Sequence, residues 1–361
     1  MVLIAGPRQV GKTTLALQFL QPSIESHPAY FNWDVTAHRP KMRNGEFPQD
    51  QPTIILDEIH KYARWKTLTK GFYDQYKSQK HFIITGSAKL NHYSRGGDSQ
   101  LGRSWFYRLH PFSLMEFNSS PTQKDLEYLL KFGGFPDPLF KGSEEYLRRW
   151  SRERIRRILQ DDLRDLERVR ELSLVESLVD LLPSRVGSPL SIKSLREDLE
   201  VAHATVENWL RILENLYVCY RIPPFGSTKI RAVKKEQKLY LWDWSSVEEP
   251  GARFENFVAN QLLKYCHLQE DAHGYRMELR YVRDTDKREV DFVVLQENRP
   301  EFAVECKLGE KNISPALYYF SERTKIARFF QVHLGTRDTG IAAKNVRILP
   351  WIQFCKELKM P

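Results

Sequence analysis

Residues 2–13 read VLIAGPRQVGKT, and this stretch decides the fold of the N-terminal part of the chain. The apolar run at 2–5 is typical of a strand buried in a parallel sheet. The residues after it fit the pattern GxxxxGK[ST], and TTLALQFL then continues as an amphipathic helical pattern. A glycine-rich loop between such a strand and such a helix predicts a phosphate-binding P-loop.

The residue types in the loop predict what each of them does. Lys12 would reach the outer phosphates of a nucleoside triphosphate, and Thr13 would offer its hydroxyl group to Mg²⁺. ATP and Mg²⁺ are therefore the cofactors that the sequence predicts. We expect the nucleotide to contact the loop and the start of the helix, namely Gly6, Pro7, Arg8, Gln9, Val10, Gly11, Lys12, Thr13 and Thr14.

Two further apolar strands are followed by polar residues. TIILDEIH at 53–60 contains Asp57, expected to hold Mg²⁺ through water, and Glu58, expected to polarise the attacking water. The strand at 81–86 leads into Ser87, a small polar residue that would contact the γ-phosphate or that water. Hydrolysis of ATP is the reaction that these residues predict, with Lys12, Glu58 and Ser87 taking part in catalysis.

Apolar runs typical of strands alternate with helical patterns along the first third of the chain. They lie at 2–5, about 29–33, 53–57, 81–86 and 105–109. Strands joined by helices pair in parallel, so this alternation predicts an α/β domain with a parallel sheet.

Transfer of a γ-phosphoryl group also needs positive charge at its equatorial oxygens, often from an arginine of a neighbouring subunit. Arg103 is the candidate for this role, with Arg95 and Arg108 in reserve. A solvated arginine on a loop is the alternative interpretation of each. If Arg103 acts across a subunit boundary, the protein is a homo-oligomer.

Composition restricts the remaining classes of protein. A chain of 361 residues predicts two or three domains, and no apolar run is long enough to span a membrane. The four cysteines lie far apart, without ligand-like spacing, which favours a reducing cytoplasm. The net charge of +9 favours an acidic partner such as DNA, or a basic surface with no polyanionic partner.

The middle of the chain is predicted to be helical. KFGGFPDPLF at 131–140 is rich in glycine and proline and indicates a break after the ATPase core. The stretch 143–171 mixes arginines with acidic residues at helical spacing, which favours a solvated face with internal ion pairs over a DNA-binding ridge.

Residues 172–246 follow the pattern of a winged helix. A short helix at 190–199, a turn and a second helix precede two strands at 219–225 and 238–244. The second helix of such a module can enter a DNA groove, but the module also serves in protein–protein contacts. The basic loop between the strands is the better candidate for phosphate contact, through Lys229, Arg231, Lys234 and Lys235.

The C-terminal part places acidic residues within apolar segments. A helix at 252–266 carries Glu255, and strands are predicted at 277–283, 289–295 and 301–308. Acids there are costly unless they serve a purpose. In metal-dependent nucleases of the PD-(D/E)xK type, carboxylates bind one or two Mg²⁺ or Mn²⁺ ions and a lysine orients water. The candidates are Glu255, Asp291 and Glu305 as metal ligands and Lys307 as the lysine; a relic fold is the alternative.

Together these motifs resemble the AAA-like P-loop ATPases of bacteria and archaea that carry a C-terminal domain of unknown function numbered 4143. GPRQVGKTT, ILDEIH, ITGS, GGFPDP, FENFV, REVDFVV and VECK occur in the order of that family. The resemblance implies an ATPase module, a winged helix and a restriction-endonuclease-like fold. It carries over Lys12, Thr13, Asp57 and Glu58. Members usually have a couple of dozen residues before the first strand, so a missing N-terminal segment is also expected.

The predicted division is an ATPase core at 1–135, a helical linker at 136–171, the winged helix at 172–246 and the nuclease-like domain at 247–361. The predicted function is Mg²⁺-dependent ATP hydrolysis acting on or with DNA, with a candidate nuclease domain. The alternative is a nucleotide-switched signalling ATPase that contacts a protein partner through an inert nuclease-like domain. A DNA-binding regulator with vestigial ATPase activity is disfavoured by the intact pair Asp57 and Glu58.

Overall fold

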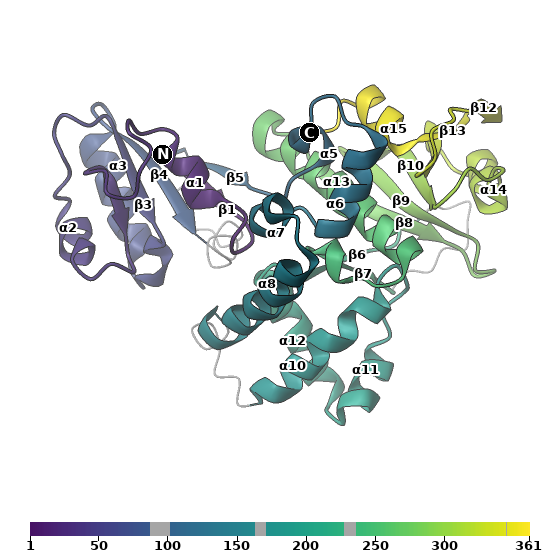
Figure 1. Ribbon diagram of the computed structural model, residues 1–361, viewed down its shortest axis with the longest axis horizontal. Helices are drawn as coiled ribbons and strands as arrows, with labels where there is room; N and C mark the ends of the chain where they lie inside the picture. Colours follow the sequence, from purple (N-terminus) through teal and green to yellow (C-terminus); the bar gives the residue numbers. More distant parts are fainter. Residues whose placement is uncertain (87–101, 163–170, 227–235, 344) are drawn as a thin grey trace. The chain divides into compact units, whose positions relative to one another are not determined.

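A computed structural model describes residues 1–86, 102–162, 171–226, 236–343 and 345–361 (Figure 1). The chain divides into two compact units. The first comprises Met1–His110 with Asn215–Tyr217, and the second comprises Pro111–Glu214 and Val218–Pro361. The predicted fourfold division of the chain stays a prediction.

The first unit is built on a five-stranded sheet in which all neighbouring strands are parallel. Its strands, in the order β2-β3-β4-β1-β5, are β2 (Tyr30–Asn32), β3 (Thr53–Asp57), β4 (His81–Gly86), β1 (Val2–Ala5) and β5 (Trp105–Arg108). The predicted parallel sheet is therefore confirmed. The register places Asp57 opposite Thr85 and Ala5 opposite Gly86, so the P-loop and the acidic strand end meet at one edge of the sheet.

Helices cover this sheet and bury its continuous apolar runs. They are α1 (Lys12–Leu17), α2 (His38–Asn44), the 3-10 turn η1 (Ile59–Lys61) and α3 (Trp65–Tyr76). Three consecutive residues of β3, at 54–56, have no exposed surface, as expected for a strand covered on both faces. Phe47 packs edge-on against Phe72 of α3 and Phe82 of β4, which joins helix and sheet.

The second unit begins with helices whose starts are specified by the sequence. They are α5 (Leu114–Phe117), α6 (Gln123–Phe132), α7 (Pro136–Lys141), α8 (Glu144–Arg157), the π turn η2 (Ile158–Asp162), α10 (Leu172–Leu181), the 3-10 turn η3 (Leu182–Arg185), α11 (Ile192–Leu199) and α12 (His203–Asn215). Ser113 and Glu116 form a capping box on α5, and Thr122 and Asp125 form one on α6.

The charges of α8 pair with one another along the helix. Arg148, Arg149 and Arg157 each form an ion pair with a glutamate four residues earlier, all on exposed side chains. Arg154 differs, because it is buried and its guanidinium lies 4.2 Å from the centre of the Phe135 ring. The described part of α8 thus has the solvated, internally paired face that mixed charges predict.

After α11 and α12, the chain forms a two-stranded antiparallel sheet of β6 (Cys219–Ile222) and β7 (Lys238–Leu241). Arg221 of β6 pairs with Glu207 and Glu214 of α12 and so attaches the sheet to that helix. The order of elements is the predicted one, and the winged-helix assignment stays a prediction. The predicted phosphate-contacting residues Lys229, Arg231, Lys234 and Lys235 lie outside the described residues.

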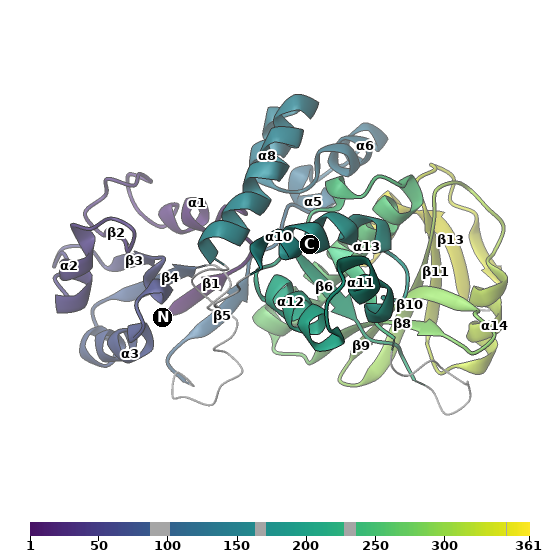
Figure 2. The same ribbon diagram turned by 90° about the horizontal axis from the view of Figure 1, so that it is seen from below.

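The C-terminal part is a six-stranded mixed sheet covered by helices (Figures 1 and 2). After the 3-10 turn η4 (Trp244–Ser246) come α13 (Pro250–His273), β8 (Met277–Arg283), β9 (Glu289–Gln296), β10 (Arg299–Lys307), α14 (Pro315–Arg323), β11 (Arg328–His333), β12 (Gly340–Ala343), β13 (Val346–Pro350) and α15 (Trp351–Glu357). The strand order is β12-β13-β11-β10-β9-β8, with β11 parallel to both β10 and β13.

Aromatic side chains attach the helices to this sheet. Phe354 of α15 packs against Phe302 of β10 and Phe330 of β11, and Trp351 of the same helix packs against Phe257 of α13. The helix α14 instead buries Leu317 and Phe320 in a cluster with valines of β8 and β9. Among the described residues, none of the helices combines the length and apolar character that a membrane span requires.

Candidate functional site

The backbone of the P-loop bends through positive φ angles at Gly6, Gln9 and Gly11. A Cβ atom on Gly6 would lie 2.3 Å from the carbonyl oxygen of Leu109, so only glycine fits this close approach. The ammonium group of Lys12 is buried within the loop, where it donates to the carbonyl oxygens of Gly6 at 3.0 Å and Pro7 at 2.7 Å. The loop therefore already holds its positive charge where phosphate would bind.

Asp57 lies at the centre of a set of hydroxyl donors. Thr13 Oγ1 and Tyr30 OH each donate to Asp57 Oδ2 at 2.8 Å, and Thr85 Oγ1 donates to Oδ1. The Asp57 side chain is almost completely buried. The two predicted Mg²⁺ ligands, Thr13 and Asp57, are thus in direct contact although they are 44 residues apart in the chain.

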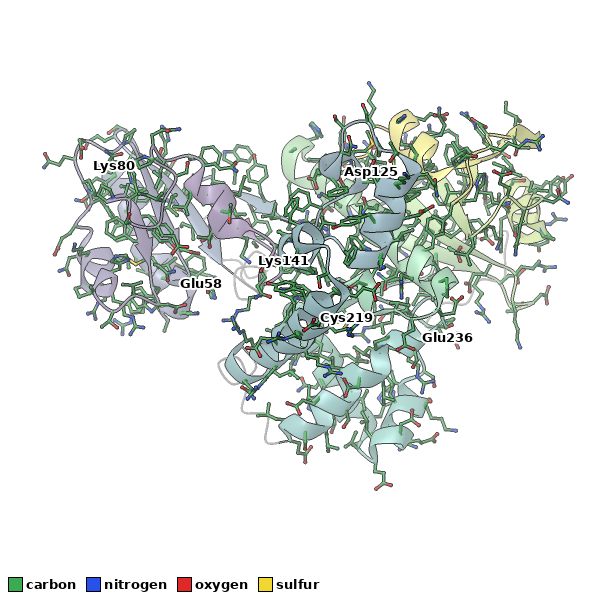
Figure 3. The ribbon with its side chains drawn as sticks, viewed as in Figure 1. Glu58, Lys80, Asp125, Lys141, Cys219 and Glu236 are labelled. Atoms are coloured by element: carbon green, nitrogen blue, oxygen red, sulfur yellow. The ribbon has the colours of Figure 1, made fainter. Side chains whose placement is uncertain are left out.

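Glu58, labelled in Figure 3, begins the turn η1 in a left-handed conformation with φ of 55°. Its backbone N–H donates to the carbonyl of Thr85 at 3.1 Å, which attaches the start of η1 to the end of β4. Lys61 Nζ lies 3.6 Å and His60 Nε2 lies 3.7 Å from Glu58 Oε2. Burial, with Asp57 as the next cause, raises the pKa of the Glu58 carboxyl above its ordinary value. A carboxylate with a raised pKa is a stronger proton acceptor, which suits a general base.

The residues of this site fit a magnesium nucleotide. Mg²⁺ prefers oxygen ligands, and a hydroxyl and a carboxylate oxygen stand in contact beside the loop. The buried ammonium of Lys12 and the backbone of the loop supply the complementary positive groups.

Tyr30 and Thr85 complete the site in ways that the motifs do not specify. Thr85 lies within the predicted strand at 81–86, and Tyr30 lies in an apolar run without any signal of its own. Their hydroxyl groups hold both oxygens of Asp57, which fixes the orientation of the carboxylate.

The candidate arginines and Ser87 were also predicted to belong to the ATPase site. Arg103 is partly exposed, and its Nε donates to Asp74 of α3 at 3.0 Å within the same unit. A role for Arg103 in a neighbouring subunit stays a prediction. Arg108 is the last residue of β5, whereas Ser87 and Arg95 lie outside the described residues.

A second cluster of charged residues lies in the C-terminal part, around Lys238 at the start of β7. Lys238 Nζ lies 2.6 Å from Glu289 Oε1, 3.0 Å from Glu255 Oε1 and 3.3 Å from Asp291 Oδ1. The lysine side chain has no exposed surface. Burial alone would lower the pKa of this ammonium group, but the carboxylates of Glu255, Asp291 and Glu289 outweigh burial and raise it well above its usual range.

The other predicted metal ligands and their lysine lie next to this cluster. Tyr240 OH donates to Glu255 Oε1 at 2.7 Å, and the backbone N–H of Cys306 donates to Asp291 Oδ2 at 2.9 Å. Lys307 Nζ donates to Glu305 Oε1 at 2.6 Å, so these two side chains, two residues apart, lie on the same side of the strand. Burial, followed by the charge of Asp291, raises the pKa of Glu305 to about 8 and that of Glu255 to about 7.

This cluster does not fit a resident divalent cation in the arrangement that it has. The place between Glu255 and Asp291 is taken by the ammonium group of Lys238. Within the described ranges, no group of three or more His, Cys, Asp or Glu residues is arranged to hold a metal ion. Lys238 was missed in the sequence because a lysine at a strand start, after a basic loop, has the pattern of a solvated residue.

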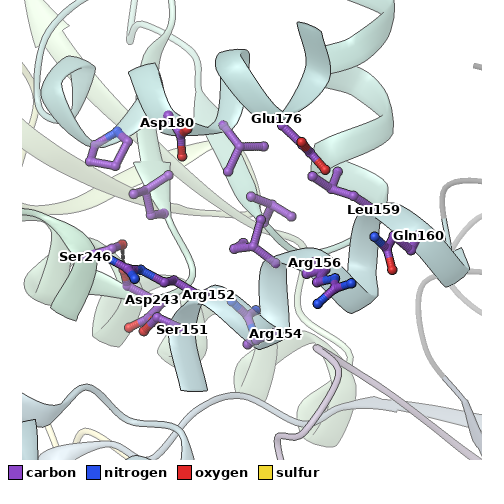
Figure 4. A pocket seen from close by; sticks show the side chains of 15 residues that line it. Ser151, Arg152, Arg154, Arg156, Leu159, Gln160, Glu176, Asp180, Asp243 and Ser246 are labelled. Atoms are coloured by element: carbon purple, nitrogen blue, oxygen red, sulfur yellow. Dashed lines mark hydrogen bonds between the residues drawn. The ribbon is translucent and has the colours of Figure 1, made fainter. Parts of the chain in front are cut away.

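Two of the cavities in the described part of the second unit are bordered by charged residues. One, of about 800 Å³, is bordered by Glu255 and Cys306 and by further acids, Asp180, Glu248 and Glu249. The other, of about 550 Å³, lies among α8, α10 and β7 and combines apolar walls with Arg152, Arg154 and Arg156 (Figure 4). The acidic lining of the first cavity repels a phosphate backbone unless cations neutralise it.

The fold of the first unit and the geometry of its site have the features of a P-loop nucleotide-binding domain. Residues 1–118 match the family model of an AAA domain, and residues 250–354 match that of the domain of unknown function DUF4143. Residues 123–247 match a further domain of unknown function, DUF8612. The chain therefore carries an AAA domain followed at its C-terminus by DUF4143, which confirms the resemblance based on the motifs.

Similar whole proteins are known from an archaeon. Uncharacterized protein MJ1637 of Methanocaldococcus jannaschii is 22% identical over 414 residues, covering 98% of this chain and 84% of that protein. Uncharacterized protein MJ1544 of the same organism is 20% identical, covering 92% of this chain and 80% of that protein. Among solved structures, the Thermotoga maritima RuvB Holliday junction branch migration motor is 16% identical, covering 62% of this chain and 82% of that chain, with a TM-score of 0.29. A TM-score this low gives the likeness no weight.

Proposed function

We propose that this protein hydrolyses ATP in a Mg²⁺-dependent reaction at the P-loop. The contact between Thr13 and Asp57 supports the proposal, because it brings the two expected oxygen ligands of Mg²⁺ together beside Lys12. When bound, Mg²⁺ would neutralise charge that develops on the phosphate oxygens.

Side chains of the first unit would take part in that reaction. On binding ATP, the ammonium group of Lys12 exchanges the carbonyls of Gly6 and Pro7 for phosphate oxygens. Glu58 accepts the proton of the attacking water, and its raised pKa favours that step. Tyr30 and Thr85 hold Asp57 in one orientation throughout.

Phosphate release from ATP by purified protein tests the proposal. Lys12→Ala is expected to abolish turnover, and Glu58→Gln is expected to bind ATP and keep it unhydrolysed. Lys77→Ala, which changes an exposed residue of the same unit, is the matched control and should keep wild-type turnover. Undiminished hydrolysis by Lys12→Ala would contradict the assignment of the P-loop.

The proposal extends to DNA as a partner of the ATPase. Residues 1–110 hold 15 Lys and Arg against 8 Asp and Glu, so they carry +7 of the net +9 of the chain. A positive surface on the ATPase unit favours contact with a polyanion. Binding of the winged-helix module to DNA and assembly into a homo-oligomer through Arg103 belong to the same proposal, as does a cytoplasmic location.

The second candidate function is a nucleotide switch that acts on a protein partner and carries an inert nuclease-like domain. The position of Lys238 among Glu255, Glu289 and Asp291 favours this candidate over an active metal nuclease. Incubation of linear, circular and single-stranded DNA with Mg²⁺ or Mn²⁺ separates the two. Cleavage that is lost in Asp291→Ala would support the nuclease, and intact DNA with wild-type protein would support the switch.

A further inference from the structure

The carboxylate cluster of the C-terminal part already has a cation of its own. An ammonium group has three N–H donors and no acceptor, and Lys238 has three carboxylate partners, from Glu255, Glu289 and Asp291. The face of the Tyr281 ring lies 5.6 Å from Nζ and adds a weaker favourable contact. Every donor of this lysine is therefore matched inside the protein.

The cluster joins two separately matched segments of the chain. Lys238 lies in the segment that matches DUF8612, whereas its three partners lie in the segment that matches DUF4143. Near the lysine, Asn256 of α13 exchanges hydrogen bonds with the backbone N–H and carbonyl of Leu241 in β7. The ion cluster thus forms the charged end of a contact between β7 and α13.

The oxygens that a metal would need are largely in use. Both oxygens of Asp291 accept hydrogen bonds, from Lys238 and from the backbone of Cys306. Glu255 Oε1 accepts from Lys238 and Tyr240. Glu305 Oε2 is buried and has no hydrogen-bond partner within the described chain. Mg²⁺ takes roughly six oxygen ligands, so it would have to displace the donors that already hold Asp291 and Glu255 Oε1.

The positive charge of Lys238 also disfavours a divalent cation in the cluster. A divalent cation at these oxygens would lie beside a buried ammonium group, and like charges at that separation repel strongly at low dielectric constant. The cluster could accept such an ion only if Lys238 withdrew from it. Such a withdrawal would remove the ion pairs that join β7 to α13 and to β9.

We propose that Lys238 is the resident cation of the DUF4143 carboxylate cluster, that it takes the place of a divalent metal, and that it fastens β7 to α13 and β9. The ion pairs of the cluster thus stabilise the folded protein. This proposal is independent of ATP hydrolysis, because it concerns residues outside the P-loop.

The first test measures Mn²⁺ binding to nucleotide-free full-length protein by electron paramagnetic resonance. Wild type and Asp291→Asn are expected to give the same binding curve, because neither holds Mn²⁺ in the cluster. A site in the wild type that Asp291→Asn removes would overturn the proposal. This comparison leaves Lys238 unchanged, so it shows whether the cluster binds a divalent ion even if variants of Lys238 fail to fold.

The second test replaces the cation itself. Lys238→Met leaves three partly buried carboxylates without their partner and is expected to lower Tm by on the order of 10 °C. Added Mn²⁺ should restore part of that loss, and the double variant Lys238→Met with Asp291→Asn should lose this Mn²⁺ effect. Lys325→Met, at an exposed position, is the control. Equal Tm values for Lys238→Met and Lys325→Met would contradict the fastening role.

Discussion

Asp57 accepts hydrogen bonds from three hydroxyl groups, each contributed by a different element: Thr13 of α1, Tyr30 of β2 and Thr85 of β4. The motifs predicted Thr13 and Asp57, because the carboxyl ends of parallel strands lie at one edge of the sheet, where the P-loop and the acidic end of β3 meet. Tyr30 could not be predicted in this way, since its role depends on the register of β2 against β3.

The hydroxyl groups behind Asp57 are expected to matter for catalysis without touching the nucleotide. Thr85→Val keeps the shape of the side chain and removes its donor, so Asp57 loses a fixed orientation. We expect a fall of about 10–100-fold in ATPase activity at limiting Mg²⁺, as for other residues that orient metal ligands. Steady-state rates over a Mg²⁺ titration measure this. Tyr62→Phe, which changes a hydroxyl elsewhere in the unit, should leave the rates unchanged.

Two glycine substitutions separate a required glycine from a dispensable one. Gly6→Ala would bring Cβ to 2.3 Å from the Leu109 carbonyl, so strain of about 1–3 kcal/mol and loss of ATP binding are expected. Gly71→Ala lies within α3 with no atom within 4 Å of the added Cβ, and a gain of about 0.5–1 kcal/mol is expected. Thermal melts and nucleotide titrations check both. A lower Tm for Gly71→Ala than for Gly6→Ala would contradict the account.

The burial of Lys238 and its ion pairs could not be predicted from the sequence around it. Its sequence context, a basic loop before an apolar strand, is that of a solvated lysine. Its partners Glu255 and Asp291 lie 17 and 53 residues further along the chain, and only the packing of β7 against α13 and β9 brings them together. Long-range burial of a charge leaves no local pattern in the sequence.

At the scale of elements, the bounds of the strands in the first sheet could be predicted from the sequence. The helices and strands of the C-terminal part could be predicted less completely. Parallel strands buried on both faces are continuous apolar runs, so β1, β3 and β4 fall within a residue of the predicted ranges. The predicted helix at 252–266 is instead 24 residues long, because Pro250 and the cap at Glu249 start it earlier and Gly274 ends it. The strands β11 and β13 follow no motif and were not assigned from the sequence.

Arg221 holds the element β6 against the element α12. Its guanidinium pairs with Glu214 at 2.7 Å and with Glu207 at 2.9 Å, and its side chain is largely buried. Arg221→Met is expected to destabilise the protein by about 1–3 kcal/mol, because two acids lose their partner. Arg196→Met removes an exposed pair and should change stability by less than about 0.5 kcal/mol. Equal shifts of Tm for both variants would contradict this difference.

At the scale of the whole molecule, positive charge is unevenly distributed along the chain. Residues 111–361 hold 40 Lys and Arg against 38 Asp and Glu, a net of +2, while residues 1–110 carry +7. Three exposed arginines of α8, Arg148, Arg149 and Arg157, pair with glutamates of the same helix, so part of the positive charge of α8 is balanced locally. The ATPase unit is therefore expected to attract a polyanionic partner more strongly than the arginine-rich stretch 143–171 does.

This distribution predicts which charge reversals weaken DNA binding. Lys41→Glu with Arg43→Glu alters exposed cations of α2 in the ATPase unit and is expected to weaken binding on the order of tenfold at low salt. Arg148→Gln with Arg149→Gln removes two cations that already pair with Glu144 and Glu145, and little change is expected. Fluorescence anisotropy with labelled duplex DNA over a salt titration measures both. If the α8 variant loses more affinity than the α2 variant, DNA contacts the helical segment, and the charge of the ATPase unit serves ATP or another acidic partner instead.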